Sequence, residues 1–223
     1  MRRLLLLALL AVAPQPDTRP TVAVMFFTNG AMERKADYEP FTRGIANMLV
    51  TGLGANPAIR LVEREQLQKL LDEGTFGRSG RVDRETAVQI GRIVSAHHMI
   101  FGGFIIEPGG RIRIDARAVD VATSELEYVD QVEGKTTNMF ALIDQLAAKL
   151  NRGLRLPPMP VRPRAPEALK PRPEKWFVLY SRAMLAEDRH ETADAIALYQ
   201  QVLAEYPGYE PAVESLKRLS GST

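Results

Sequence analysis

The stretch HHMIFGGFIIEPGGRIRIDARAVDVATSELEYVDQVEG, residues 97–134, decides the fold of this chain. From Arg111 to Val121 charged and apolar residues alternate, and a period of two is the side-chain repeat of a half-buried β-strand. Pro108-Gly109-Gly110 supplies a hairpin turn before this strand, and the turn Asp120–Glu125 leads into a further extended segment, Leu126–Glu133. The ladder carries no nucleophile, metal cluster or phosphate loop, so it predicts a scaffold rather than an enzyme.

Upstream of this stretch, the sequence predicts strands that alternate with helices. The run TVAVMFF at Thr21–Phe27 is apolar throughout, which is typical of a buried central strand. Apolar residues recur at helical spacing from Phe41 to Leu53, and Gly54 and Pro57 follow as stop signals. We expect an α/β domain, a mixed five-stranded sheet with packed helices, because helical crossovers come first and antiparallel hairpins follow. The expected order is strand 21–27, polar loop 28–37, helix 41–53, strand 59–62, short helix 67–71, helix 84–94, strands 97–106, 111–121 and 126–133, and helix 140–153.

The helix expected after residue 83 has a recognisable N-terminus. Asp83 is a favoured N-cap residue, and Thr86 stands three positions later, where its backbone N–H can bond to the Asp83 carboxylate. Helical spacing predicts that four apolar side chains of this helix face the core. These are Ala87, Ile90, Ile93 and Val94.

The first thirteen residues are typical of a secretory signal peptide. Arg2 and Arg3 form a positively charged start, Leu4–Val12 is an apolar run, and Ala11-Val12-Ala13 offers a small-x-small cleavage site. The apolar run is far shorter than the roughly 20 residues that a membrane-spanning helix needs. We therefore expect residues 1–13 to direct export.

Composition and motifs argue against several classes of function. The absence of cysteine removes disulfides, thiol catalysis and cysteine metal sites, and the net charge falls from +2 to 0 without Arg2 and Arg3, so no basic excess favours nucleic acid. Adjacent His97 and His98 point to opposite faces of a strand, which fits one core and one exposed histidine better than a metal site. Gly102-Gly103 indicates a bulge or close backbone contact, and Gly74–Gly80 lacks the Lys-Ser/Thr of a phosphate loop. We expect no catalytic residue, metal or cofactor.

A proline-rich segment, residues 154–175, divides the chain into two domains. It holds seven of the fifteen prolines, and basic residues outnumber acidic ones within it. Proline fixes φ and removes N–H donors, so we expect an extended linker without a core of its own. A basic linker could touch an anionic lipid or polymer, and a solvated spacer is the alternative. The predicted domains are an α/β domain at 20–153 and a helical module at 176–219.

The helical module resembles a tetratricopeptide repeat. Ala183, Ala195, Tyr199 and Pro207 fall where the repeat pattern has a small residue, a small residue, an aromatic residue and the closing proline, while His190 replaces a usual glycine. One complete repeat buries little surface, so the module should dock on the first domain, pair with itself, or be completed by a partner. The expected helices are Trp176–Glu187, Thr192–Glu205 and Pro211–Leu219.

The first helix of such a repeat lines its concave face, which gives the module a candidate protein-binding site. Aromatic and methionine side chains flanked by acidic groups can hold a peptide segment. The alternative is that the same side chains pack against the first domain. The candidate residues are Phe177, Tyr180, Met184, Glu187 and Asp188.

The first domain resembles the CsgG family of curli production and assembly components, which is related to the N-terminal domain of TolB. The most specific pieces are Leu61-Val62-Glu63-Arg64, Val119-Asp120-Val121-Ala122-Thr123 and the helix-glycine-strand passage Ile93–Gly103. Ser124 stands where the family usually has glycine, which affects only the type of that turn. The likeness extends over about residues 20–153 and includes TVAVMFF, FTRGIANMLVTGL, IRLVEREQLQKLL and TAVQIGRIVSAHHMIFGGF.

The resemblance implies a non-enzymatic protein of the bacterial periplasm or outer-membrane-bounded envelope, which acts through protein partners and forms a homo-oligomer. One alternative is an oligomeric outer-membrane secretion channel of the curli type, and peripheral association with the outer membrane is a further option. Two departures weigh against the channel: no cysteine is available for lipidation, and the sheet itself uses the whole region His97–Glu133, which leaves no long membrane-spanning hairpins. A second alternative is a ligand-binding or enzyme-regulating periplasmic domain.

Overall fold

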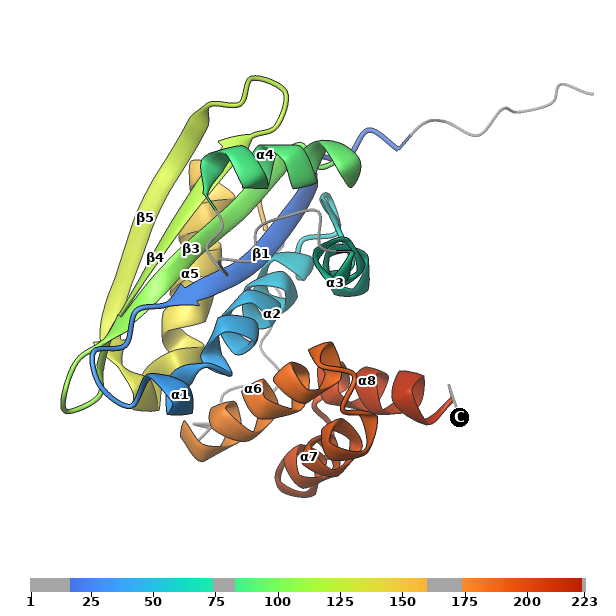
Figure 1. The fold of residues 1–223 in the computed structure, drawn as a ribbon. Helices are drawn as coiled ribbons and strands as arrows, with labels where there is room; N and C mark the ends of the chain where they lie inside the picture. Colours follow the sequence, from blue (N-terminus) through green and yellow to red (C-terminus); the bar gives the residue numbers. More distant parts are fainter. Residues whose placement is uncertain (1–16, 74–82, 160–173, 222–223) are drawn as a thin grey trace, which may run out of the picture.

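The computed structural model describes residues 17–73, 83–159 and 174–221. Its elements are β1 (Thr21–Asn29), α1 (Lys35–Tyr38), α2 (Phe41–Gly54), β2 (Arg60–Leu61), α3 (Arg64–Asp72), α4 (Arg84–Ile93), β3 (His98–Ile106), β4 (Arg111–Asp120), β5 (Leu126–Lys135), a 3-10 turn (Thr136–Asn138), α5 (Met139–Gly153), α6 (Glu174–Asp188), α7 (Thr192–Glu205) and α8 (Glu210–Ser220). The strands form one sheet in the order β2-β1-β3-β4-β5, and α6 to α8 form a helical module beside it (Figure 1). The predicted fold class, a mixed five-stranded sheet with packed helices, is confirmed.

The alternating stretch at residues 111–121 forms β4, which lies between β3 and β5 in the sheet. β4 pairs antiparallel with both β3 and β5, with Arg113 opposite Ile105 and Glu133. Ile112, Ile114, Ala116 and Ala118 are fully buried, whereas the arginines between them are exposed. The predicted period of two therefore separates a core face from a solvated face, as side chains alternate along a strand.

The turn before β4 depends on two glycines. Gly109 and Gly110 have φ angles of 87° and 80°, in the left-handed region that glycine adopts without a steric penalty. The turn reverses the chain between β3 and β4, as predicted.

β1 is the central strand that the sequence predicted, and it pairs parallel with β2 and β3. Its register with β3 shifts between Val24 and Phe27, next to Gly102. A Cβ atom at Gly102 would lie 2.0 Å from the Asp115 carbonyl oxygen, so only glycine permits this close backbone approach. The predicted close contact at Gly102 is confirmed, and the irregularity lies in β1.

Two hydrophobic clusters cover the two faces of the sheet. α2 and α5 pack on one face, and α3 and α4 pack on the other. Burial of these apolar side chains is the main favourable term in folding such a domain. The first cluster includes Val22, Ile100, Phe104, Ile112, Phe41, Ile45, Leu49, Leu146 and Leu150, and the second includes Ala23, Met25, Met99, Phe101, Leu67, Ala87 and Ile90.

α4 begins as predicted, although one of its side chains differs from expectation. The backbone N–H of Thr86 donates to the Asp83 carboxylate over 2.8 Å, which confirms the N-cap. The prediction that Ile93 is buried is wrong, because 52% of its surface is exposed. The helix instead turns the i, i+3, i+4, i+7 stripe of Ala87, Ile90, Gly91 and Val94 toward the sheet, which leaves Ile93 on its flank.

The polar loop expected at 28–37 contains more regular structure than predicted. β1 continues to Asn29, and α1 forms one short helical turn before α2. The Asn29 side chain organises this connection, since its amide donates to the Lys35 carbonyl over 2.8 Å and its oxygen accepts from the Ala31 backbone N–H over 3.0 Å. A hydrogen bond from a single side chain does not alter the periodicity of apolar residues, so this local structure was not predicted.

The segment after α5 remains packed on the domain for several residues. Leu154 and Leu156 are buried in the first cluster, although the sequence placed them in a linker without a core. The Asn56 side-chain amide donates to the Pro157 carbonyl over 2.7 Å and fixes the chain there. The remainder of the predicted linker, from residue 160 to residue 173, lies outside the described residues, as do the predicted signal peptide and the whole glycine-rich segment at 74–80.

The helical module shares a hydrophobic core with the sheet domain. α6 lies beside α2, and its apolar side chains join the cluster that contains Phe41 and Ile45 (Figure 1). α7 packs against α6, and α8 packs against α7. Within the described residues, no helix has the length and apolar character needed to cross a bilayer.

Candidate protein-interaction site

The five residues that the sequence proposed for protein binding lie together on α6, on the side that faces the sheet domain. Phe177, Tyr180 and Met184 are each at most 2% exposed. The rings of Phe177 and Phe41 meet edge to face, with their centroids 4.8 Å apart. α2 therefore occupies the face on which a peptide was predicted, which corresponds to the alternative of packing against the first domain.

Close approach of α2 and α6 depends on a small residue. A Cβ atom built on Gly44 of α2 would lie 1.9 Å from the Ser181 hydroxyl oxygen of α6. Any larger side chain at this position would push the two helices apart, because packed interiors leave no spare volume. Gly44 thus permits a close contact between α2 and α6, the two helices that form the joint between the sheet domain and the helical module.

Aromatic rings surround Tyr180 at one end of this joint. Trp176 stacks on Tyr180 with ring centroids 5.5 Å apart, and Tyr209 meets it edge to face at 5.1 Å. The Asn47 side-chain amide of α2 donates to the Tyr180 hydroxyl. Burial raises the Tyr180 pKa well above its usual value, so this hydroxyl stays protonated.

A cluster of charged groups closes the other end of the joint. The Arg64 guanidinium, at the start of α3, donates to Asp188 and lies 2.6 Å from a Glu187 carboxylate oxygen. Arg43 of α2 also donates to Asp188, over 3.2 Å, and Arg218 of α8 contacts Glu187. The Asp188 side chain is only 2% exposed. The two acidic residues predicted to flank a peptide therefore bind arginines of the same chain.

Burial and ion pairing act in opposite directions on these groups. Burial raises the pKa of the Asp188 carboxyl, and the guanidinium groups of Arg64 and Arg43 oppose that rise. Burial likewise lowers the Arg64 pKa, but the carboxylates of Asp188 and Glu187 outweigh it and leave that pKa above its usual value. Each charged group thus stabilises the charged form of its partner, as buried charges require.

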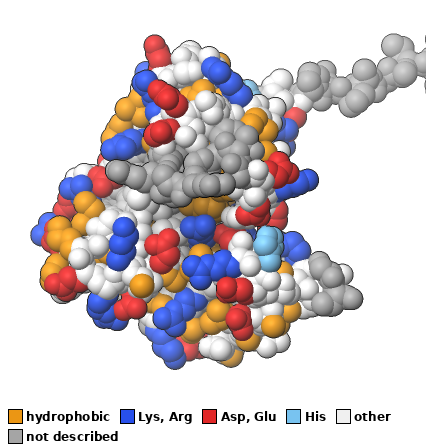
Figure 2. Space-filling view, viewed as in Figure 1, with side chains coloured by type: hydrophobic (Ala, Val, Ile, Leu, Met, Phe, Trp, Pro, Cys, Tyr) orange, Lys and Arg blue, Asp and Glu red, His pale blue; other side chains and the backbone are white. Residues whose placement is uncertain are grey.

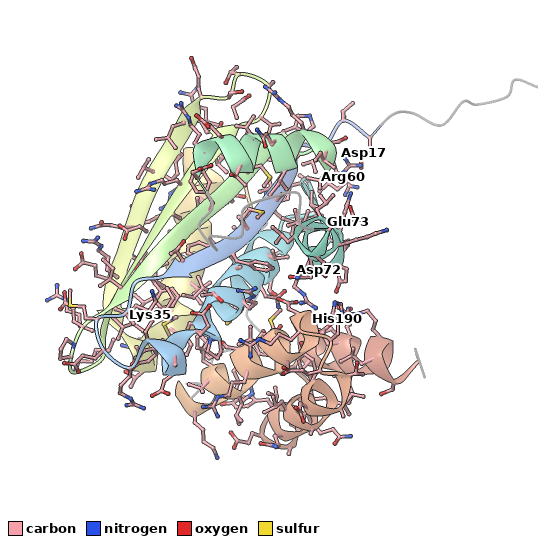
Figure 3. All side chains as sticks on the ribbon, in the orientation of Figure 1. Asp17, Lys35, Arg60, Asp72, Glu73 and His190 are labelled. Atoms are coloured by element: carbon pink, nitrogen blue, oxygen red, sulfur yellow. The ribbon has the colours of Figure 1, made fainter. Side chains whose placement is uncertain are left out.

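A weaker contact lies at the edge of the joint. The His190 Nε2 atom, in the turn between α6 and α7, is 3.4 Å from an Asp72 carboxylate oxygen at the end of α3 (Figure 3). The His190 side chain is 78% exposed, so solvent screens this pair.

A groove on the described surface lies beside this joint, between the module and the α1 region. It has a volume of about 920 Å³ and is bounded by α1, the start of α2, α6 and α7. Basic and acidic side chains gather on the lower part of the face shown in Figure 2, where the module lies. Sequence reasoning missed this groove, although residues 182, 185, 186 and 189 have the spacing of one helix face.

Of the two adjacent histidines, His97 precedes β3 and His98 is its first residue. His97 is exposed, and its Nδ1 atom accepts a hydrogen bond from the Thr21 backbone N–H over 3.0 Å. His98 is partly buried, with its Nδ1 atom 2.6 Å from a Glu127 carboxylate oxygen, so neither histidine lies in the hydrophobic core. Among the described residues, no three His, Cys, Asp or Glu side chains are grouped as metal ligands would be.

The fold and this joint define a class of protein: an α/β domain with a mixed sheet, packed against a helical module of the same chain. Residues 6–106 match the family model described as curli production assembly/transport component CsgG, which confirms the resemblance to the CsgG family over this part of the chain. The match ends at the last residue of β3 and covers just under half of the chain. No curated protein sequence matches the chain.

Solved structures with a similar arrangement include domains from several bacterial proteins. The LpoB C-terminal domain from Escherichia coli has 17% identity and a TM-score of 0.39, over 55% of this chain and 87% of that one. TolB from Acinetobacter baumannii has 10% identity and a TM-score of 0.42, over 62% of this chain and 29% of that one. A PelC dodecamer from Paraburkholderia phytofirmans has 13% identity and a TM-score of 0.39, over 63% and 90%. Likeness at these values carries no conclusion about function.

Proposed function

We propose that this chain is an exported, non-enzymatic protein of the bacterial envelope that acts through protein contacts as an assembly or transport component. The observation that carries this proposal is the family match over residues 6–106, which includes β1, β2 and β3. The exposed, charged face of β4 adds support, since such a face suits a solvated scaffold. Self-association belongs to the proposal and has its own readout in the experiment below.

The helical module contributes a second surface to this role. Its aromatic face is covered by α2, so a peptide would reach Phe177, Tyr180 and Met184 only if α6 left α2. Binding of a peptide by these residues, with Glu187 and Asp188, stays a prediction. The groove on the opposite side of α6 and α7 is open in the described structure.

Fractionation and cross-linking of the full chain would test the proposal. We expect a tagged chain made in a Gram-negative host to lose its first residues, to reach the envelope fraction, and to form cross-linked adducts of higher mass. Light scattering without detergent would report self-association separately. An unprocessed cytoplasmic product, or a substrate turned over by the pure protein, would overturn the proposal. A ring of many subunits that requires detergent would favour the secretion channel.

A further inference from the structure

The groove on the helical module is built from two matching stripes of side chains. Arg182, Leu185 and Ala186 of α6, with Arg189 directly after its last residue, line one wall at i, i+3, i+4 and i+7. α7 supplies the other wall with the same spacing, and the two helices run antiparallel. The α7 residues are Asp194, Ala197, Leu198 and Gln201.

The middle of each stripe is apolar and its ends are polar. Leu185 and Leu198 are only partly buried, and the exposed side chain of Ala197 adds to the floor between them. Ala36 and Pro40 extend this apolar floor from the α1 side. Two helices that present such parallel stripes leave a furrow into which the ridge of a third helix packs.

The charges along the rim have no ionic partners within the part of the chain that the structure describes. Arg182 on α6, Arg189 just after α6 and Lys35 on α1 form no salt bridge to a described residue. The same holds for Asp194 and Glu191, at the opposite wall. This situation contrasts with the joint, where Glu187 and Asp188 are bound by several arginines. The groove thus offers two arginines along its α6 wall and two acidic groups at the start of its α7 wall, with Lys35 and Glu39 on the α1 side.

We propose that this groove binds an amphipathic helix of a partner protein, one that carries acidic residues on the flank facing α6 and a basic residue on the flank facing α7. An apolar stripe on that helix would cover Leu185, Ala197 and Leu198, and its acidic flank would meet Arg182 and Arg189, which are one heptad apart. A volume of about 920 Å³ holds about two turns of a helix whose diameter is about 10 Å. The proposal rests on the protein-binding role proposed above and names the contact that would serve it.

A synthetic peptide can test this assignment on the full chain. The probe is a fluorescein-labelled amphipathic helix of about 14 residues, or about four turns, with a Leu/Ala stripe, Glu residues on one flank and Lys residues on the other. We expect a dissociation constant of about 10–100 µM by fluorescence anisotropy, and no binding of a peptide with the same composition in scrambled order. The double variant Arg182→Glu/Arg189→Glu should weaken binding about tenfold. A peptide with its acidic flank changed to Lys should bind that variant better than it binds the natural chain.

Matched variants separate this site from general effects of charge. Lys69→Glu/Arg84→Glu makes the same charge change on exposed residues of α3 and α4 and should leave peptide binding unchanged. Equal binding of the scrambled peptide, or failure of the charge-swapped peptide to recover affinity, would overturn the proposal. A dimer of the unliganded chain that Arg182→Glu/Arg189→Glu converts to a monomer would also overturn it, because a second copy would then fill the groove. If the chain does not bind the peptide but still forms cross-links in the envelope, the proposed role of the groove is wrong and the proposed function still stands.

Discussion

The sheet domain and the helical module are stabilised in different ways. The sheet domain closes one hydrophobic cluster entirely with its own strands, α3 and α4. The module has no separate cluster among the described residues: Trp176, Phe177 and Tyr199 belong to the cluster that also contains Phe41 of α2. The module is therefore an extension of the sheet domain's fold, and its aromatic face is an internal contact in this structure.

Charged pairs show the same contrast. On the sheet, Arg111 and Glu133 pair over 2.9 Å with side chains that are 66% and 39% exposed. At the joint, Arg64 binds Glu187 and Asp188, whose side chains are 8% and 2% exposed. Exposed pairs contribute little because water screens them, whereas removing one partner of a buried pair leaves an uncompensated charge. The joint is therefore the place where single charges matter.

Truncation of the shared aromatic core should have the largest effect. We expect Phe177→Ala to lower the free energy of unfolding by about 3–5 kcal/mol, since a fully buried ring leaves a cavity in the cluster. Chemical denaturation gives this quantity, and hydrogen exchange should show faster opening of α2 and α6. Phe101→Ala, in the other cluster, is the matched control and should affect β3 and α4 instead. A natural chain that unfolds in two separate steps, with the module first, would contradict the shared core.

Removal of a buried guanidinium should come next. Arg64→Met leaves the Asp188 and Glu187 carboxylates with fewer partners, and we expect a loss of about 3 kcal/mol in the free energy of unfolding. Arg111→Met removes an exposed partner and should cost less than about 1 kcal/mol. The double variant Arg64→Met/Asp188→Leu should recover only part of the loss, because it removes the buried Asp188 carboxylate but leaves Glu187 without Arg64 and Arg43 without Asp188. Equal effects of Arg64→Met and Arg111→Met would show that the two regions do not differ.

Acid should produce the smallest effect, and it should arise in the sheet domain. Hydrogen bonds from Lys149 and Tyr128 lower the Asp130 pKa to about 2. A lowered folded-state pKa stabilises the fold above the unfolded value of about 4, and this stabilisation is lost as the pH falls toward 2. After allowance for solvent screening we expect about 1 kcal/mol. Asp130→Asn should abolish this share of the acid sensitivity in pH-dependent denaturation, and an unchanged pH profile would contradict it.

The sequence predicted the sheet well because the signal there is local. The alternation from Arg111 to Val121 and the apolar run at β1 both reflect burial against the chain's own neighbours. Asp83 and Thr86 sufficed to place the start of α4, since an N-cap is a contact over three residues. Ile93 was misplaced because helical spacing alone does not say where the centre of the buried stripe lies.

The candidate site was harder to predict, because α6 carries apolar or small residues around much of its circumference. Phe177, Tyr180 and Met184 face α2, while Leu185 and Ala186 face the groove. Both sets have helical spacing, so periodicity cannot show which set is buried against α2 and which lines the groove. The acidic pair Glu187 and Asp188 was recognised as a unit, but its partners Arg64 and Arg43 are distant in sequence, and only folding brings them together.

The strands, most of the helices, the two faces of the sheet and the CsgG-like character of the first domain could be predicted from the sequence alone. The strands, helices and faces follow from periods of two and of 3.6 residues, which depend on chain geometry that every residue shares, whereas the CsgG-like character follows from motifs such as Leu61-Val62-Glu63-Arg64. Which face of α6 is covered by α2, and which remains open, depends on the tertiary structure. That choice depends on the fit between α2 and α6 at Gly44 and on buried charges from three separate helices, and neither leaves a pattern within one stretch of sequence.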